Sequence, residues 1–214
     1  MSRSANDHDV LLFDLGGVLI DVDFDMAFTI WGAYSGVPTP LLRARFSIDT
    51  CYERHERGEI DAAEYFDSLR NALGIKLTDA EFEEGWNAIL GKEIKVTTAL
   101  LAQLEPHIPL YLLSNSNKTH HRYWAKQFAP MLSHFERAFV SSDIGKRKPD
   151  PEVFAHVALE IGVPAARILF FDDSKENIDG AQRIGMSAIH VTSTDSVKNA
   201  VKEYFCETDF NSKE

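Results

Sequence analysis

Short apolar runs, each followed at once by polar residues, constrain the fold of this chain more than any other feature. The runs lie at residues 10–13, 110–113, 138–140, 168–171 and 188–191. Runs of this length are typical of strands buried on both faces. Helical patterns occupy residues 98–105, 120–128, 151–161 and 178–184. Alternating strands and helices predict an α/β fold with a mainly parallel, Rossmann-like sheet covered by helices on both faces.

A long helical section interrupts this alternation after the first strand. Residues 18–25 are expected to be extended or hairpin-like, and helices are expected at 26–34 and from 40 to about 57. Capping boxes at 61–64 and 78–81 open two further helices, which end near Gly74 and Gly91. The sequence therefore predicts an α/β core formed by residues 1–24 and 96–214, and an inserted all-helical cap at 25–95.

The charge balance excludes some partners and leaves others open. A formal net charge of -11 over 214 residues argues against a general nucleic-acid surface. A local cluster of Lys and backbone N–H groups can still bind a phosphate. The N-terminus lacks the apolar segment of a signal peptide, and no run has the length of a membrane span. With only Cys51 and Cys206, far apart, we expect a cytoplasmic protein with reduced thiols and no membrane partner. No pattern indicates an oligomeric state.

Polar residues at three strand ends predict a site with phosphate chemistry. Asp14 follows the first run, Ser114 and Asn115 follow the second, and Asp172 and Asp173 follow the fourth. The carboxyl ends of parallel strands meet at one edge of a sheet, so these groups should lie together. Converging carboxylates repel one another unless a cation neutralises them, and Mg²⁺ prefers such oxygen ligands. With a lysine from residues 146–148, this set would suit phosphoryl transfer from a small phosphorylated metabolite.

Four motif regions carry a resemblance to a known family. They read Phe13-Asp14-Leu15-Gly16-Gly17-Val18, Leu113-Ser114-Asn115, Lys148-Pro149, and Phe171-Asp172-Asp173-Ser174 with Asn177. In this order, and with a helical insertion after the first strand, the chain resembles the haloacid dehalogenase-like (HAD) hydrolases. The segment 55–59 and the pair at 180–181 are similar to the subgroup containing bacterial glucose-1-phosphate phosphatase and the phosphatase domain of soluble epoxide hydrolase.

The resemblance implies a phosphatase for sugar phosphates such as glucose 1-phosphate, with a distinct role for each site residue. Asp14 would attack phosphorus to form an aspartyl-phosphate, which water then hydrolyses. Ser114 and Asn115 would bind the transferring phosphoryl group, while Lys148 would steady the charge of nucleophile and phosphate. Arg57 is a candidate to contact the sugar from the cap, and a solvated charged turn around Gly58 is an equal alternative.

The resemblance also implies a magnesium site, with one departure from the family pattern. Asp173 matches the acidic metal ligand, beside Asp14, while Asp172 would act behind it or on the metal's waters. Where the phosphatases commonly carry a second Asp as general acid/base, this chain has Gly16, which offers substrate and metal only its backbone, including its C=O. Such proton transfer is typically worth about 10²–10⁴-fold in rate. We hypothesise that Asp21 replaces the missing acid, although an exposed hairpin Asp is the simpler interpretation.

Two other functions are compatible with parts of this pattern. A haloacid dehalogenase would also use Asp14 as nucleophile and lack an Asp at position 16, but it would not need the acidic pair Asp172 and Asp173, because carbon–halogen displacement requires no metal. A non-catalytic phosphate- or partner-binding module would keep the fold without turnover. Each motif also has a purely structural alternative, as a helix cap for Asp173 or a solvated basic turn for Lys148.

Overall fold

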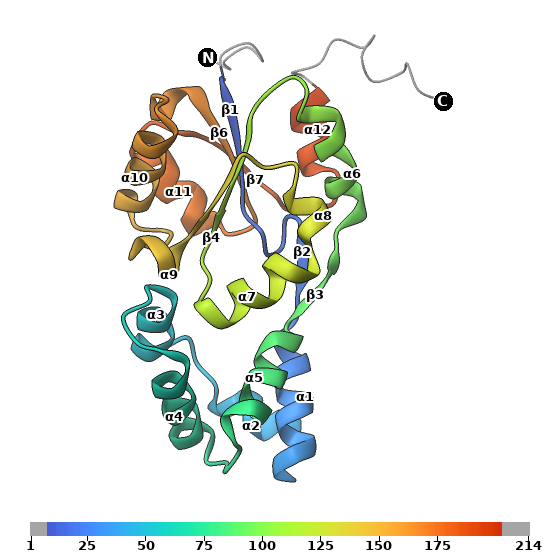
Figure 1. Cartoon of the computed structure of the whole chain (residues 1–214), viewed down its shortest axis with the longest axis vertical. Coiled ribbons are helices and arrows are strands. Elements are labelled where there is room, and N and C mark those ends of the chain that lie inside the picture. Colours follow the sequence, from blue (N-terminus) through green and yellow to red (C-terminus); the bar gives the residue numbers. More distant parts are fainter. Residues whose placement is uncertain (1–7, 203–214) are drawn as a thin grey trace.

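The computed structural model, which describes residues 8–202, confirms the predicted α/β fold (Figure 1). Its central sheet has five parallel strands in the order β5-β4-β1-β6-β7. Their bounds are β1 Val10–Phe13, β4 Leu110–Ser114, β5 Arg137–Val140, β6 Ile168–Asp172 and β7 Ser187–His190. The first strand thus lies in the middle, and residue 14 leaves the sheet between the ends of β4 and β6.

The central strand is buried because alternate side chains enter two separate cores. Leu11 and Phe13 point into one core, and Val10 and Leu12 point into the other. All four side chains are at most 3% exposed. This explains why the run is uniformly apolar rather than alternating.

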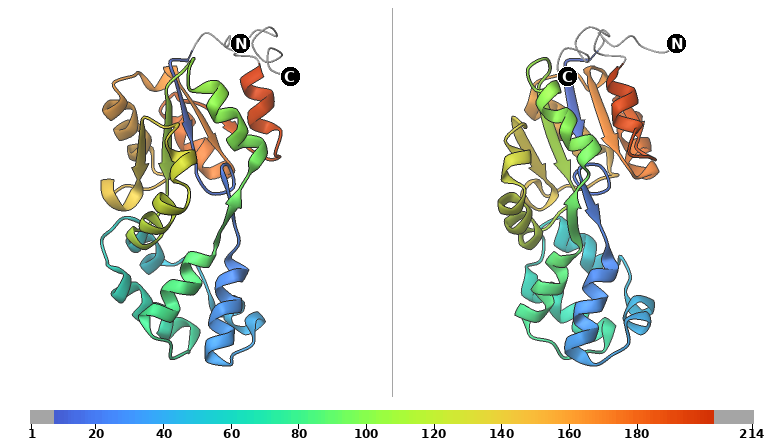
Figure 2. Two further views of the ribbon diagram at one scale, coloured as in Figure 1. Left: turned by 45° about the vertical axis from the view of Figure 1, so that its right-hand side comes forward. Right: turned by 90° about the vertical axis from the view of Figure 1, so that its right-hand side faces the viewer.

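Helices cover both faces of the sheet (Figure 2). One core is closed mainly by α6, α7, α8 and α12, and the other by α10 and α11. Their bounds are α6 Lys95–Leu104, α7 Lys118–Gln127, α8 Ala129–Leu132, α9 Ser141–Ile144, α10 Pro151–Ile161, α11 Lys175–Arg183 and α12 Ser196–Lys202, with a 3₁₀ turn at Ala165–Arg167. The helix predicted at 151–161 has the observed bounds, with a proline in its first turn.

The segment between β2 and β3 is helical and has its own apolar core, centred on Trp31, Tyr65, Phe82 and Trp86. The helices are α1 Phe24–Ser35, α2 Thr39–Arg45, α3 Thr50–Glu56, α4 Ala62–Leu73 and α5 Asp79–Ala88. Both predicted capping boxes are present, at the starts of α4 and α5. The single helix expected from 40 to about 57 was wrong, because the chain leaves the helix at Phe46, whose ring packs against the aromatic core, and restarts after Asp49 caps α3.

A two-stranded antiparallel ribbon connects this helical segment to the sheet-bearing part (Figure 2). It consists of β2 Ile20–Val22 and β3 Leu90–Glu93. The extended segment predicted at 18–25 supplies β2, whereas β3 was expected to be the end of a helix. The chain crosses between its two parts only at this ribbon, so we continue to use the name cap for residues 25–95 as a proposed unit.

Some expectations fall on residues that the structure does not describe. Residues 1–7 and 203–214 of the predicted core, including Cys206, lie outside the described range. Within residues 8–202, no helix combines the length and the apolar character needed to cross a bilayer.

Candidate active site

Asp14 lies where β1 ends and is held firmly in place. Its backbone N–H donates to the carbonyl of Phe171 on β6 at 2.9 Å. Its carboxylate oxygen Oδ1 accepts the Leu15 N–H at 2.7 Å and lies 2.7 Å from Lys148 Nζ. Asp14 is 8% exposed. The side chain is therefore oriented by donors from two different segments, as a nucleophile requires.

Lys148 contacts carboxylates at the ends of two different strands. Its ammonium group lies 2.7 Å from Asp14 and 2.7 Å from Asp172 Oδ2, and the side chain is 1% exposed. The Asn115 side chain fixes its backbone, because Asn115 Nδ2 donates to the Lys148 carbonyl and Asn115 Oδ1 accepts from the Lys148 N–H, both at 2.8 Å. Asn115 therefore positions the lysine in addition to any contact it makes with phosphate. Ser114 precedes it as the buried last residue of β4.

The two neighbouring aspartates have different surroundings. Asp172 is fully buried, and it accepts hydrogen bonds from Lys148, from the Ser174 N–H at 2.8 Å and from Asn177 Nδ2 at 2.9 and 3.0 Å. Asp173 is exposed, and its carboxylate lies over Gly17, where a Cβ atom would meet Asp173 Oδ2 at 2.1 Å. The Asp172 carboxylate is thus occupied by hydrogen bonds from the protein, whereas the Asp173 carboxylate is exposed and available to a ligand.

The donor set fits a divalent cation. Asp14, Asp172 and Asp173 each place a carboxylate oxygen so that these atoms lie within 4.8 Å of one another. Three carboxylates and the one ammonium of Lys148 leave an excess of two negative charges when all are ionised. Burial raises the pKa of Asp14 to about 8, with Lys148 opposing and Asp172 adding to the rise. Burial and the Asp172 charge also raise the pKa of Asp173. Hard oxygen ligands with unbalanced charge are the setting that Mg²⁺ neutralises.

The lysine behaves as a cation despite its burial. Desolvation lowers the pKa of Lys148, but the charges of Asp14 and Asp172 outweigh it, so the pKa is raised above its usual value. The ammonium therefore stays charged at neutral pH and can stabilise negative charge on a neighbouring group.

Position 16, which holds the second acid in the family pattern, would accept a side chain only if the exposed Val22 side chain shifted. A Cβ atom at Gly16 would lie 2.9 Å from Val22 Cγ2. Asp21 is exposed, and its Cβ lies beside Gly91 on β3, where the register of the ribbon shifts. That Asp21 replaces the missing acid stays a prediction.

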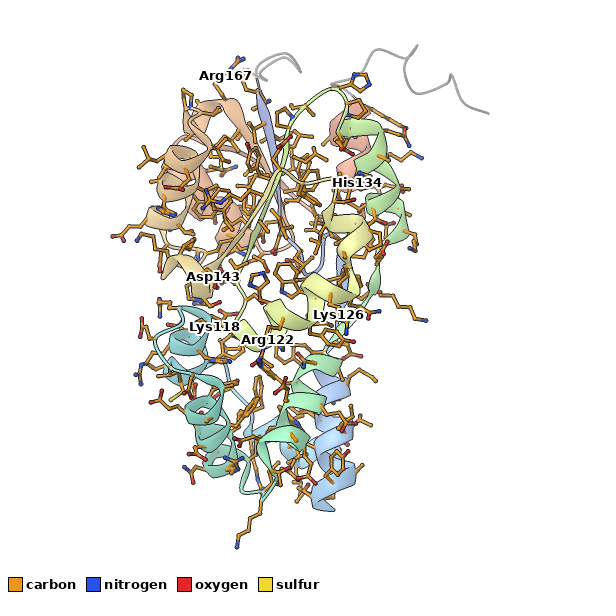
Figure 3. All side chains as sticks on the ribbon, in the orientation of Figure 1. Lys118, Arg122, Lys126, His134, Asp143 and Arg167 are labelled. Atoms are coloured by element: carbon orange, nitrogen blue, oxygen red, sulfur yellow. The ribbon has the colours of Figure 1, made fainter. Side chains whose placement is uncertain are left out.

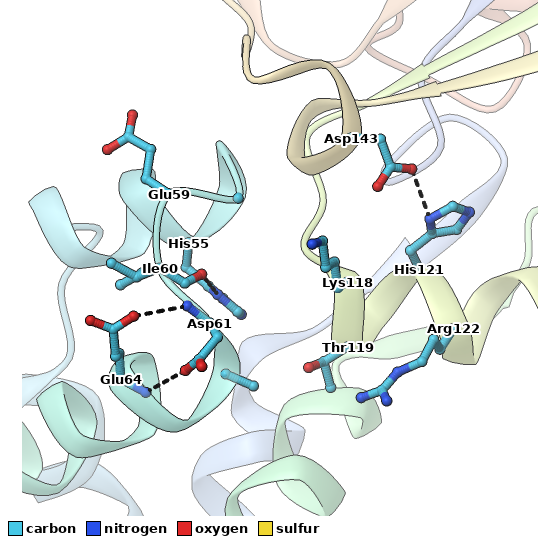
Figure 4. A pocket seen from close by; sticks show the side chains of 12 residues that line it. His55, Glu59, Ile60, Asp61, Glu64, Lys118, Thr119, His121, Arg122 and Asp143 are labelled. Carbon is cyan, nitrogen blue, oxygen red and sulfur yellow. Dashed lines mark hydrogen bonds and ion pairs between the residues drawn. The ribbon is translucent and has the colours of Figure 1, made fainter.

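A cavity of about 660 Å³ opens where the cap meets the start of α7 (Figure 4). His55 faces it from the cap, and Thr119 faces it from α7. Both residues are buried, yet His55 Nε2 and Thr119 Oγ1 lack hydrogen-bond partners. Lys118 and Arg122 also line the cavity, and Figure 3 shows both at this junction. These two atoms are closed to solvent, so the polar groups that the cavity offers to a ligand are charged side chains of its wall such as Lys118 and Arg122. Neither Asp14 nor Lys148 lines this cavity.

The predicted substrate residue Arg57 lies in ion pairs rather than against the catalytic carboxylates. Its guanidinium group is 3.4 Å from Glu53 Oε2 and 3.7 Å from Asp150 Oδ2. No role was predicted for Arg147, the residue before Lys148. Its Nη2 lies 2.8 Å from Glu56 Oε2 in the cap. The sequence feature that could have identified Arg147 is its position directly before Lys148, in a run of three cationic residues.

A family model and characterised relatives match most of this chain. The model of the haloacid dehalogenase-like hydrolase family matches residues 8–185. D-Ribitol-5-phosphate phosphatase from Bacteroides thetaiotaomicron is 23% identical over 180 residues, covering 82% of this chain and 87% of its own. A sesquiterpene phosphatase from Aspergillus oryzae is 28% identical over 185 residues, covering 85% and 88%.

Solved structures share the fold. A HAD family enzyme from Bacteroides thetaiotaomicron, in complex with magnesium and inorganic phosphate, superposes with a TM-score of 0.75 at 29% identity, covering 86% of this chain and 93% of that one. L-2-haloacid dehalogenase from Xanthobacter autotrophicus has a TM-score of 0.65 at 18% identity, covering 95% and 86%. At 18% identity, the similarity to the dehalogenase shows a shared fold alone.

Proposed function

The chain belongs to the haloacid dehalogenase-like hydrolase family and is a magnesium-using phosphatase, and from this premise we propose that it hydrolyses small sugar phosphates through an aspartyl-phosphate on Asp14. The observation that carries the proposal is the position of Lys148 Nζ, 2.7 Å from both Asp14 and Asp172, with Asp173 at the same cluster. This arrangement combines a nucleophile, a fixed cation and a metal-binding face.

We assign the steps to groups that the structure holds in place. Asp14 attacks phosphorus while Leu15 N–H and Lys148 keep its carboxylate in one orientation. The P–O bond to the substrate alcohol breaks, and the leaving oxygen takes a proton from water. A water molecule then hydrolyses the aspartyl-phosphate, which releases inorganic phosphate and restores Asp14. Lys148 stabilises the negative charge of nucleophile and phosphoryl group, and Ser114 and Asn115 bind that group. Asp14, Asp173 and the carbonyl of Gly16 are the proposed magnesium ligands, with Asp172 supporting them. When bound, the ion supplies charge neutralisation and orients the phosphate.

Sugar phosphates fit both the cavity and the missing acid. Lys118 and Arg122 line the cavity, and their charged groups can donate hydrogen bonds to substrate hydroxyls. Sugar 1-phosphates also have comparatively good leaving groups, which reduces the need for an acid at Gly16. The similarity to D-ribitol-5-phosphate phosphatase supports a hydroxylated substrate.

Lys118→Met tests this substrate assignment. The variant keeps an unbranched apolar side chain and removes the ammonium group that can donate to a substrate hydroxyl. We expect kcat/KM for glucose 1-phosphate to fall about 3- to 10-fold, the value of one hydrogen bond, while an aryl phosphate without hydroxyls is unaffected. Lys126→Met, on the same helix, is the matched control. An equal loss with both substrates would show that Lys118 does not select for hydroxyls.

Metal withdrawal tests the phosphatase chemistry. We expect EDTA to reduce hydrolysis of an aryl phosphate to less than about one hundredth, and added Mg²⁺ to restore it. Asp14 must be ionised to attack, and its pKa in the metal-free site is about 8. A nearby dication favours the carboxylate, so the acidic limb of the kcat/KM profile should move to lower pH as Mg²⁺ is raised. Turnover that is insensitive to EDTA would contradict the proposal.

A further inference from the structure

A chain of ion pairs joins cap helix α3 to the loop that carries Lys148. Arg147 contacts Glu56 Oε2 through Nε at 2.9 Å and through Nη2 at 2.8 Å, and its Nη1 lies 3.1 Å from Glu53 Oε1. The other oxygen of Glu53 contacts Arg57 at 3.4 Å, and Arg57 reaches back to Asp150 at 3.7 Å. The charges alternate in sign, so every member has an opposite partner.

This contact is buried, unlike an ordinary surface pair. The Glu56 side chain is 7% exposed and that of Arg147 is 14% exposed. The backbone of the two parts also meets here, because a Cβ atom at Gly58 would lie 2.4 Å from the Ser142 carbonyl oxygen. Docking removes both charges from water and offsets that desolvation with their ion pair, so the pairs specify which residues meet when the cap docks.

Resting on the function proposed above, we propose that Arg147 is a positioning residue that sets the catalytic geometry of Lys148 only while the cap is docked. One peptide unit separates Arg147 from Lys148, and the Arg147 carbonyl accepts the Asp150 N–H at 3.1 Å to close the turn. Asn115 holds the Lys148 backbone from the core side. The loop is thus held by Asn115 from the core and by Glu56 and Glu53 from the cap, and the contacts from the cap form only when the cap is docked.

This arrangement makes hydrolysis depend on closure. With Arg147 paired, the Lys148 ammonium reaches Asp14 and Asp172 at 2.7 Å. When the cap moves away, the fork of Arg147 loses both Glu56 and Glu53, and the loop keeps only the Asn115 anchor and its own turn. Displacement of a catalytic group by about 1 Å can cost about 10²-fold in rate. The phosphoryl site would then be fully assembled only when the cap covers it.

Neutral variants of the pair test the proposal. We expect Arg147→Gln and Glu56→Gln each to lower kcat for an aryl phosphate by about 10- to 100-fold, with KM changed by less than about 3-fold. The double variant should be no worse than the single ones, because both remove the same link. Arg147→Lys should be intermediate, since it keeps the charge but cannot contact both carboxylates as a fork. Lys146→Gln removes the neighbouring cation and serves as the matched control.

Amide hydrogen exchange gives a second readout that does not require turnover. The Lys148 N–H, bonded to Asn115 Oδ1, should exchange faster in Arg147→Gln and Glu56→Gln than in the wild type, and unchanged in Lys146→Gln. Unchanged exchange, purely additive losses, or losses matched by Lys146→Gln would overturn the positioning role. If the wild type hydrolysed no phosphate ester, the proposed function would fail, while the exchange data would still decide whether cap docking orders the loop.

Discussion

Replacing Asp14 with Asn is expected to lower kcat for any phosphate ester by at least about 10⁴-fold, because an amide cannot act as the nucleophile. The substitution preserves the shape of the side chain and the oxygen that accepts the Leu15 N–H. Steady-state rates with magnesium and an aryl phosphate, measured beside the wild type, give the loss. Retention of more than about a tenth of the rate would exclude Asp14 as nucleophile.

Stability measurements separate this loss from misfolding. Because the pKa of Asp14 is raised to about 8 in the folded protein, the group contributes most to stability below its unfolded pKa of 3.8, and that contribution is lost as pH rises through 8. The Asn variant, which cannot ionise, should therefore gain stability relative to the metal-free wild type as pH rises from 5 to 8. Urea unfolding with EDTA at both pH values provides the comparison. A stability difference between variant and wild type that does not move in favour of Asn between pH 5 and pH 8 would contradict this electrostatic account.

Lys148→Met has the second large expected effect, on both rate and stability. Methionine fills similar space but removes the only cation that Asp14 and Asp172 share in the described structure. Breaking a buried ion pair on one side costs about 3–5 kcal/mol, and loss of charge stabilisation in an active site costs about 10²–10³-fold in kcat. Urea unfolding without metal, together with steady-state kinetics, measures both quantities.

The pH dependence and a neighbouring residue provide the controls for that variant. At low pH, Asp14 is protonated and needs no counter-charge, so the stability lost in Lys148→Met should be smaller at pH 5 than at pH 8. Lys146→Met, two positions earlier in the same loop, should change both quantities little. Equal effects of the two substitutions would show that Lys148 has no special place in the site.

The sequence was sufficient for the core because its signals are local. The apolar run Val10–Phe13 became the central strand, and the helix predicted at 151–161 was confirmed with the same bounds. The meeting of Asp14, Asp172 and Asp173 at one edge followed from the rule that ligands bind beyond the carboxyl ends of parallel strands.

The errors concern contacts between distant segments. The strand Leu90–Glu93 has a weak local pattern and exists because it pairs with β2 nearly seventy positions earlier. The break at Phe46 follows from packing of its ring on Phe28 and Phe24 of α1, which no period along the segment reveals. Likewise, Arg147 and Glu56 are 91 residues apart, so their pairing could not be read from either motif. Of these features, only the pairing of Arg147 with Glu56 depends on how the cap docks.

Covalent trapping on Asp14 tests the central claim most directly. Wild-type protein mixed with magnesium and excess aryl phosphate is quenched in acid during steady turnover, and its peptides are mapped by mass spectrometry. We predict one phosphoryl group on the peptide that contains Asp14, absent when the substrate is omitted and absent from Asp14→Asn. Rapid turnover under conditions that preserve acyl phosphates, with no phosphoryl group on that peptide or with the group on another residue, would contradict it.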